Sequence, residues 1–239
     1  MLPALNREAP VAQRDQANGD YIWVVQFDEG TLRPLASIVG DFLHNLRTAL
    51  DHLVWELSSD AERGRCEFPV FLKSGAGNDG FHGGGLRKIA SIPDAAKSII
   101  EELQPFHAEE HAASHPLWLI HDLDRIDKHR RTLIVPVAIN RGGIAGAPVR
   151  LGGGTGPAMV FQLERMRITT GKRRNGEEVL RIAASNPPES VALVTPLFGF
   201  NATIDEAGLE EVFIQEQLRG LLDFVDGSVI PRLEPIFDS

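Results

Sequence analysis

The pattern of hydrophobic positions changes period near residue 35. Residues 21–27 alternate between apolar and polar side chains, which predicts an edge strand that leads through a Glu29-Gly30 turn to Pro34. From Leu35 onward the apolar residues recur at steps of three and four, which predicts an amphipathic helix over about residues 35–59. The stripe of this helix comprises Ile38, Val39, Phe42, Leu43, Leu46, Leu50, Leu53, Val54 and Leu57.

The next part of the chain alternates between breaks and short helices. Residues 75–85 are rich in glycine, and because glycine loses much conformational entropy on ordering, we expect a mobile surface loop there. A helix is predicted over about residues 93–103, ending before Pro105. A further helix follows Pro116. Its apolar stripe comprises Leu119, Ile120, Leu123 and Ile126.

After Arg131 the pattern becomes that of β-structure. Strands are predicted over residues 133–139, 159–169, 179–184 and 191–204, and Asn175-Gly176 favours a tight hairpin turn. A last helix is predicted over residues 207–226, stopped by Gly227 and Pro231. The order of elements predicts an α+β protein, a helical bundle with an inserted antiparallel β-sheet. We expect residues 1–239 to form a single domain, with a helical core at about 35–131 and 206–232 and a β-rich insertion at about 132–205.

The composition indicates the general class of protein but not its activity. The 239 residues are 43% hydrophobic and 24% charged, as in ordinary globular proteins. The net charge of −9 argues against a nucleic-acid binder that depends on overall positive charge. No apolar run is long enough for a membrane span, the N-terminus lacks the pattern of a signal peptide, and the one cysteine excludes an intrachain disulfide. We therefore expect a cytoplasmic protein without a membrane partner. Local cationic patches remain at Arg125, Lys128, Arg130 and Arg131 and at Lys172, Arg173 and Arg174.

Candidate chemistry is confined to the helical part, because all eight histidines lie between His44 and His129. On the first long helix, two polar columns flank the apolar stripe, and Arg47 can pair with Asp51 one turn later. The columns are His44, Arg47 and Asp51, and Asp41, Asn45 and His52. The helix after Pro116 has two similar columns, namely His121, Asp124 and Lys128, and Asp122, Arg125 and His129. If the two helices pack together, Arg47, His52, Asp124, Lys128 and His129 would converge.

Three interpretations of these columns stay open. They are structural hydrogen-bond and ion-pair networks, or they form a metal site from Asp41-x-x-His44 and His121-x-x-Asp124, or they perform acid–base chemistry on a phosphodiester. A di-iron bundle also needs carboxylates from two further helices, which the sequence does not provide, so we predict no metal and no cofactor. In the third interpretation His52 moves a proton and Arg47 neutralises charge on phosphorus.

Three stretches, GDFLHNLRTALDH (residues 40–52), LQPF (103–106) and IDKHR (126–130), resemble motifs shared by a family of uncharacterised bacterial proteins. Within the first, RTALDH is similar to the Arg-x(4 to 6)-His signature of HEPN-domain proteins, helical bundles that include toxin and phage-defence ribonucleases. This resemblance implies that Arg47 and His52 form a composite site across a dimer and cleave RNA without metal. Since they lie five residues apart, about 140° around an ideal helix, they share a site only if the helix is distorted or a second chain contributes.

The leading hypothesis is therefore a HEPN-like protein, with RNA as partner and a homodimer as its state, that binds or cleaves RNA by metal-independent acid–base chemistry. The expected catalytic residues are Arg47, His52, Asp51 and Asn45. The expected substrate-binding residues are Asp124, Lys128, His129 and Arg130. The sequence leaves open whether the chain is an enzyme, a metal-independent endoribonuclease. The alternative is a non-enzymatic structural or interaction protein whose polar columns between helices form a stability network.

Overall fold

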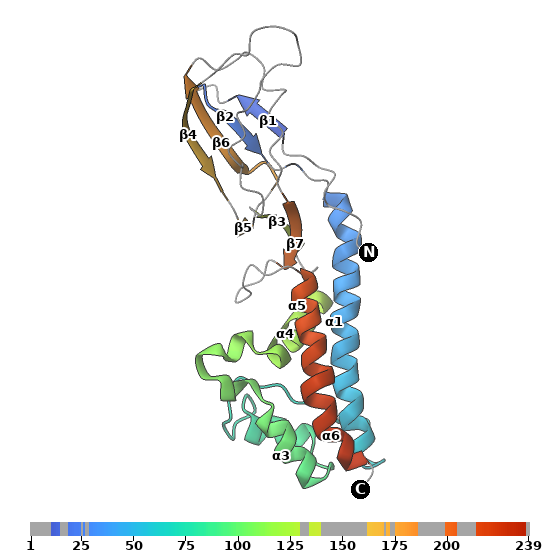
Figure 1. Cartoon of the computed structure of the whole chain (residues 1–239). Coiled ribbons are helices and arrows are strands. Elements are labelled where there is room, and N and C mark those ends of the chain that lie inside the picture. Colours follow the sequence, from blue (N-terminus) through green and yellow to red (C-terminus); the bar gives the residue numbers. More distant parts are fainter. Residues whose placement is uncertain are drawn as a thin grey trace. The chain divides into compact units, whose positions relative to one another are not determined.

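In the computed structural model the chain divides into two compact units (Figure 1). The sheet unit contains residues 1–33 and 134–205, and the helical unit contains residues 34–133 and 206–239. The structure describes residues 11–14, 19–24, 26, 29–129, 134–139, 162–169, 171–172, 175–185, 199–204 and 214–237. The α+β class, with a helical bundle and antiparallel sheets, is confirmed, although β1 and β2 of one sheet precede the first helix in the sequence. That all 239 residues form one domain stays a prediction.

The helical unit is built on α1 (Glu29–Leu57), which belongs to it from Pro34 onward, with α5 (Ile214–Phe224) lying alongside α1 in the bundle (Figure 1). Its described core is apolar and includes Leu43 and Leu50 of α1, Phe68, Ile100 and Ile120, all without solvent exposure. No helix among the described residues is both long and apolar enough to span a bilayer. In chain order the helices are α1 (Glu29–Leu57), the π-helical turn η2 (Phe81–Gly85), α2 (Leu86–Lys88), α3 (Asp94–Glu102), the 3-10 helix η3 (Pro105–Ser114), α4 (Pro116–His129), α5 (Ile214–Phe224), the π-helical turn η4 (Val225–Val229) and α6 (Ile230–Phe237).

The sheet unit holds two antiparallel sheets with strand orders β1-β2-β6-β4 and β5-β3-β7. Trp23 of β2 lies opposite Leu180 of β6, and both are buried, so these strands carry the described core of this unit. The strands are β1 (Val11–Arg14), β2 (Tyr21–Val24), β3 (Ile134–Ile139), β4 (Gln162–Ile168), β5 (Gly171–Lys172), β6 (Glu178–Ser185) and β7 (Gly199–Ile204). The predicted residues 191–198 lie outside the described residues.

Two predictions about the N-terminal part of the chain were wrong. The strand at residues 21–24 is not an edge, because β2 pairs with β1 on one side and with β6 on the other. The Glu29-Gly30 turn is instead the start of α1, which continues through Pro34. Pro34 is only the sixth residue of the helix, so its missing N–H removes one hydrogen bond near an end where most amides are unpaired.

The glycine-rich stretch is ordered, contrary to the prediction of a mobile loop. The amide of Phe81 donates to the carbonyl of Lys73 at 2.9 Å, and the amide of His82 donates to the carbonyl of Ser74 at 3.2 Å. A Cβ at Gly80 would collide with the Gly75 carbonyl, and one at Gly83 with the carbonyls of residues 76 and 77. The glycines are therefore needed for close backbone packing, which offsets their entropic cost.

The last helix also continues further than predicted. Gly227 and Pro231 do not end it, because the π-helical turn η4 carries the chain from α5 into α6. In this turn the amide of Ile230 donates to the carbonyl of Val225, five residues earlier. Such a shift in the hydrogen-bond pattern lets a helix pass a proline with little further loss.

Candidate functional site

The candidate site of the helical unit centres on an extended segment, residues 67–71, that lies outside every helix and strand. Phe68, Pro69 and Val70 are buried, with Phe68 completely so. Buried backbone N–H and C=O groups need hydrogen-bond partners, and this segment has no neighbouring strand in the described structure that would provide them. Side chains from α1 and from residue 104 take that role.

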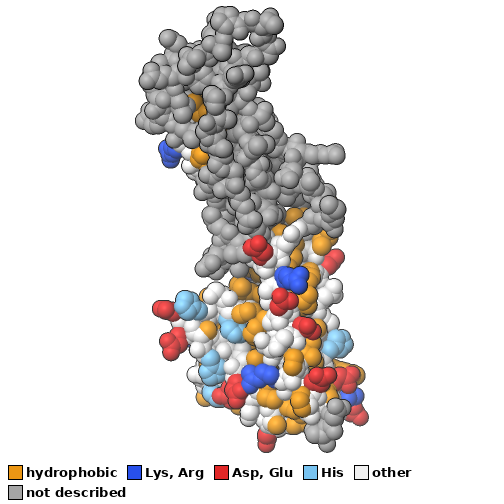
Figure 2. Space-filling model, viewed as in Figure 1, with side chains coloured by type: hydrophobic (Ala, Val, Ile, Leu, Met, Phe, Trp, Pro, Cys, Tyr) orange, Lys and Arg blue, Asp and Glu red, His pale blue; other side chains and the backbone are white. Residues whose placement is uncertain are grey.

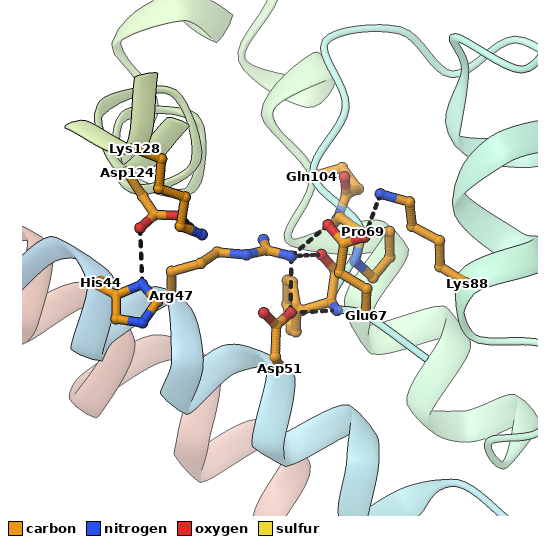
Figure 3. Close-up of polar contacts among 10 residues, drawn as sticks. His44, Arg47, Asp51, Glu67, Pro69, Lys88, Gln104, Asp124 and Lys128 are labelled. Atoms are coloured by element: carbon orange, nitrogen blue, oxygen red, sulfur yellow. Dashed lines mark hydrogen bonds and ion pairs between the residues drawn. The ribbon is translucent and has the colours of Figure 1, made fainter. Parts of the chain in front are cut away.

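Arg47 and Asp51 of α1, both shown in Figure 3, bind the peptide groups of Phe68. The Nη2 of Arg47 donates to the Phe68 carbonyl at 2.7 Å, and the Phe68 amide donates to Asp51 Oδ1 at 2.9 Å. The same Nη2 donates to Asp51 Oδ1 and to Glu67 Oε1, each at 2.8 Å, which confirms the predicted Arg47–Asp51 pair. The Arg47 side chain is 5% exposed, and its buried Nη1 has no hydrogen-bond partner among the described residues. The Nη2 side of the guanidinium therefore binds only groups of the protein, and the Nη1 side is buried away from solvent.

Gln104 holds the same segment from the opposite direction. Its Nε2 donates to the carbonyls of Pro69 at 2.8 Å and of Ile100 at 3.0 Å. Its Oε1 accepts the amide of Phe71 at 3.0 Å. Gln104 is 1% exposed, and its buried amide links the end of α3 to the extended segment by hydrogen bonds.

Two further contacts join α1 to α4. The buried carboxylate of Asp124 faces His44 Nδ1 at 3.1 Å through Oδ1 and Lys128 Nζ at 2.7 Å through Oδ2. One turn away, the carboxyl group of Asp127 lies against the backbone of Gly40, where a Cβ would collide with it. The two helices therefore pack together through their polar columns, as the sequence analysis considered.

We refer to the following eight side chains as the polar network: His44, Arg47, Asp51, Glu67, Lys88, Gln104, Asp124 and Lys128 (Figure 3). Lys88 enters it through Glu67, whose Oε2 lies 2.9 Å from Lys88 Nζ. The three Lys and Arg of the network are matched by three carboxylates. A charge-balanced cluster does not present the positive potential that a phosphate site requires.

The pKa shifts of ionisable groups in and beside the polar network reflect the cations that its carboxylates share. Burial raises the pKa of Asp51, although Arg47 and the Phe68 amide act in the opposite direction. Burial also opposes ionisation of Glu67, but the hydrogen bond and charge of Lys88, together with Arg47, bring its pKa below the usual value. Burial, with the charges of Arg47 and Lys88, lowers the pKa of the nearby His121. Arg47 thus pairs with both Asp51 and Glu67, whereas Glu67 has Lys88 as a second cation.

The structure brings together only half of the predicted site residues. Arg47 and Asp51 are in the polar network, as are Asp124 and Lys128. The other two predicted catalytic residues, Asn45 and His52, are exposed on α1 and make no hydrogen bond or ion pair with the described residues. The ring of His52 instead contacts Trp55 edge-on, with ring centroids 6.5 Å apart. The His129 side chain and Arg130 lie outside the described part of the chain.

Sequence reasoning missed Glu67, Lys88 and Gln104 as partners of Arg47 and of the extended segment. Gln104 belongs to the LQPF motif, so a signal was present, but nothing in the pattern identifies the peptide groups that it binds. The motifs at residues 40–52 and 103–106 in fact hold the same segment from two sides. The motif at 126–130 follows the α4 carboxylate, Asp124, that pairs with α1.

The metal interpretation finds no geometric support in the described residues. Asp41-x-x-His44 and His121-x-x-Asp124 do not assemble a metal site, because no group of three or more His, Cys, Asp or Glu side chains there is arranged to hold an ion. His44 and Asp124 pair with each other instead.

Comparisons with protein-family models, with curated proteins and with solved structures found no match to this chain.

Proposed function

We propose that the chain is a non-enzymatic interaction protein in which the polar network is structural. The observation that carries this proposal is the use of Arg47, Asp51 and Gln104 to satisfy the peptide groups of residues 68–71. Unpaired buried peptide groups cost about 1–3 kcal/mol each, so these side chains have a large effect on folding without any substrate. Under this proposal, partners bind elsewhere on the molecule.

The competing hypothesis, a HEPN-like ribonuclease, requires Arg47 to reach a phosphate and His52 to reach the same phosphodiester. Arg47 is closed to solvent and held by two carboxylates and a carbonyl, whereas His52 is exposed and unpaired within the described residues. To free Arg47 for a substrate, the Phe68 carbonyl would have to lose its donor while remaining buried. This requirement favours the structural interpretation.

RNA cleavage separates the two hypotheses. Purified wild type, Arg47→Lys and His52→Ala proteins would be incubated with labelled single-stranded RNA in the presence of EDTA, and the products resolved by size. We expect no cleavage above the buffer control for any of the three. Metal-independent cleavage by the wild type that both substitutions abolish, while both variants stay folded, would contradict the proposal.

The homodimer and the cytoplasmic location are also proposed. A dimer is not required for the polar network, because its hydrogen bonds all lie within one chain. Light scattering after size-exclusion chromatography measures the molar mass directly, and we expect about twice the 26.2 kDa of one chain. A mass of one chain at micromolar concentration would exclude the dimer.

A further inference from the structure

The side of α1 that faces away from the core carries a second regular pattern. Six positions from Ile38 to Trp55 recur at alternating steps of three and four residues, which places them on one stripe of the helix. Five of the six are exposed, and Thr48 is half-buried. Two helices that pack along their length contact each other at this spacing. We call this stripe the outer face, and it comprises Ile38, Asp41, Asn45, Thr48, His52 and Trp55.

The exposed part of α1 is poor in charged side chains. From position 34 to position 57 the exposed residues are Pro34, Ser37, Ile38, Asp41, His44, Asn45, Ala49, His52, Trp55 and Glu56. Only Asp41 and Glu56 among them are Asp, Glu, Lys or Arg, whereas three of the six exposed residues of α5 are charged. The centres of protein interfaces are depleted in charged residues and enriched in aromatic ones. The composition of this surface therefore favours contact with a protein.

Large apolar side chains lie at both ends of the outer face. Ile38 is 57% exposed and Trp55 is 39% exposed. Figure 2 shows hydrophobic side chains at many places on the helical unit, so the regular position of these two matters more than their exposure. Trp55 is also held in place, because the Cζ of Arg63 lies 4.2 Å from the centre of its ring and His52 contacts the ring edge-on. A side chain that is already ordered loses little conformational freedom on binding.

The outer face is complementary to a second copy of itself in the antiparallel direction. Positions that are equally far from the point between residues 46 and 47 match in their chemistry. With a two-fold axis at this point, Ile38 of one copy faces Trp55 of the other. Asp41 likewise faces His52, whose ring can donate a hydrogen bond to the carboxylate in either protonation state. Both residues are exposed, and neither makes a hydrogen bond or ion pair within the described part of the chain.

Two further features favour the antiparallel direction. Pairing in the parallel direction would place Asp41 against Asp41 of the second copy, and like charges in contact weaken an interface. In the antiparallel direction Asn45 meets Thr48 at the centre, where an amide and a hydroxyl group can form a hydrogen bond. A polar pair at such a position fixes the register of two helices.

We propose that the outer faces of two copies of this chain pack against each other as an antiparallel helix pair in a two-fold symmetric dimer. A second copy is favoured over a different protein because the outer face itself supplies the partner of each of its apolar and charged groups. Arg47 is buried and does not belong to the outer face, so the polar network stays outside this interface. This inference rests on the proposed function, because it names the partner of an interaction protein.

Charge reversal in the Asp41–His52 contact tests the inference. Exposed ion pairs contribute little, so the variants reverse charge instead of removing it. Sedimentation equilibrium of the full chain measures the dissociation constant of the dimer. His52→Glu places two carboxylates in contact twice in each dimer, and we expect dimerisation to weaken on the order of 100-fold.

The addition of Asp41→Lys to His52→Glu is expected to restore dimerisation to within a few-fold of the wild type. Positions 41 and 52 are about 16 Å apart along one helix, so the two side chains restore a contact only between copies. For the same reason, an equimolar mixture of Asp41→Lys and His52→Glu proteins is expected to form heterodimers in preference to either homodimer.

The matched control is His111→Glu on η3, which makes the same substitution at another exposed histidine. It is expected to dimerise like the wild type. A second pair of variants tests the apolar contact and does not depend on charge reversal. Ile38→Glu is expected to weaken dimerisation at least about tenfold, whereas Leu72→Glu, also at an exposed apolar residue of the helical unit, is expected to have no effect.

A monomeric wild type would overturn the inference and leave the outer face to a different partner. Equal weakening by His52→Glu and His111→Glu, or a double variant as weak as His52→Glu, would also overturn it. A dimer that no substitution on the outer face weakens would place the contact on another surface. None of these outcomes bears on the polar network, whereas Arg47-dependent RNA cleavage would refute the proposed function and leave the dimer contact unaffected.

Discussion

At the scale of single residues, the Gln104 side chain makes hydrogen bonds to the extended segment that a neighbouring strand would otherwise make. Its amide makes two donor contacts and one acceptor contact, all with backbone groups, and it is almost completely buried. The Gln104→Ala substitution leaves the Pro69 carbonyl and the Phe71 amide without these partners. We expect a loss of about 1–3 kcal/mol in the free energy of unfolding, measured by urea denaturation.

The matched control for this prediction is Gln215→Ala on the exposed side of α5. A change within about 0.5 kcal/mol is expected there, because surface substitutions rarely have larger effects. If the two alanine variants were equally stable, Gln104 would not support the extended segment.

The pH dependence of stability tests the environment of His121. Its pKa in the folded chain lies below the ordinary value of 6.5, chiefly because of burial and then because of Arg47. Below pH 6.5 the unfolded chain therefore takes up a proton that native His121 does not, so stability falls as pH falls through this value toward the lower native pKa. In urea titrations between pH 7.5 and 5, His121→Gln is expected to lose less stability than the wild type.

Asp51 contributes with the opposite sign, because its pKa is raised in the folded chain. Native Asp51 binds its proton more readily than the unfolded chain does, so this contribution increases stability as pH falls through the native pKa. It is present in both the wild type and His121→Gln, and to first order it cancels in the difference between them. Identical pH dependence in the two proteins would show that His121 is not held neutral by its surroundings.

At the scale of elements, the helices were predictable and the glycine-rich stretch was not. The apolar stripes of α1, α3 and α4 are periodic, and periodicity is a local property of the sequence. The order of residues 75–85 depends instead on backbone contacts between residues three to eight positions apart, which composition does not reveal. The same limit applies to β6, whose pairing with β2 joins residues far apart in the chain.

Alanine substitution within that stretch distinguishes packing from flexibility. Gly83→Ala places a methyl group against two backbone carbonyls, and we expect it to cost about 1–3 kcal/mol of stability. Gly75→Ala, in the same stretch, meets nothing within 4 Å and is expected to be neutral or slightly stabilising. Urea denaturation of both variants provides the comparison, and equal stabilities would mean that the stretch is loose.

The candidate site was predictable only in part for a related reason. Helical spacing alone places Arg47 beside Asp51, and that pair is confirmed at 2.8 Å. Spacing cannot show that a third acceptor is the carbonyl of Phe68, 21 residues later, or that His52 faces away from Arg47. Polar residues between helices have the same sequence pattern whether they bind a substrate or the protein's own backbone.

At the scale of the whole molecule, the polar network belongs to the helical unit. Its three Lys and Arg side chains are matched by three carboxylates, so the network balances its own charges. Because Arg47 and Asp51 bind groups of the protein itself, the motif at residues 40–52 need not contain a substrate-binding surface.

The central claim is that Arg47 is structural, and the most direct test compares the unfolding free energies of Arg47→Ala and His52→Ala. Breaking a buried pair costs about 3–5 kcal/mol, and because the Asp51 and Glu67 side chains are 37% and 41% exposed we expect a loss of about 2–4 kcal/mol for Arg47→Ala. His52→Ala is expected to stay within about 0.5 kcal/mol of the wild type. An Arg47→Ala protein that fails to fold while His52→Ala folds normally would agree with this account. Wild-type stability in Arg47→Ala would contradict it.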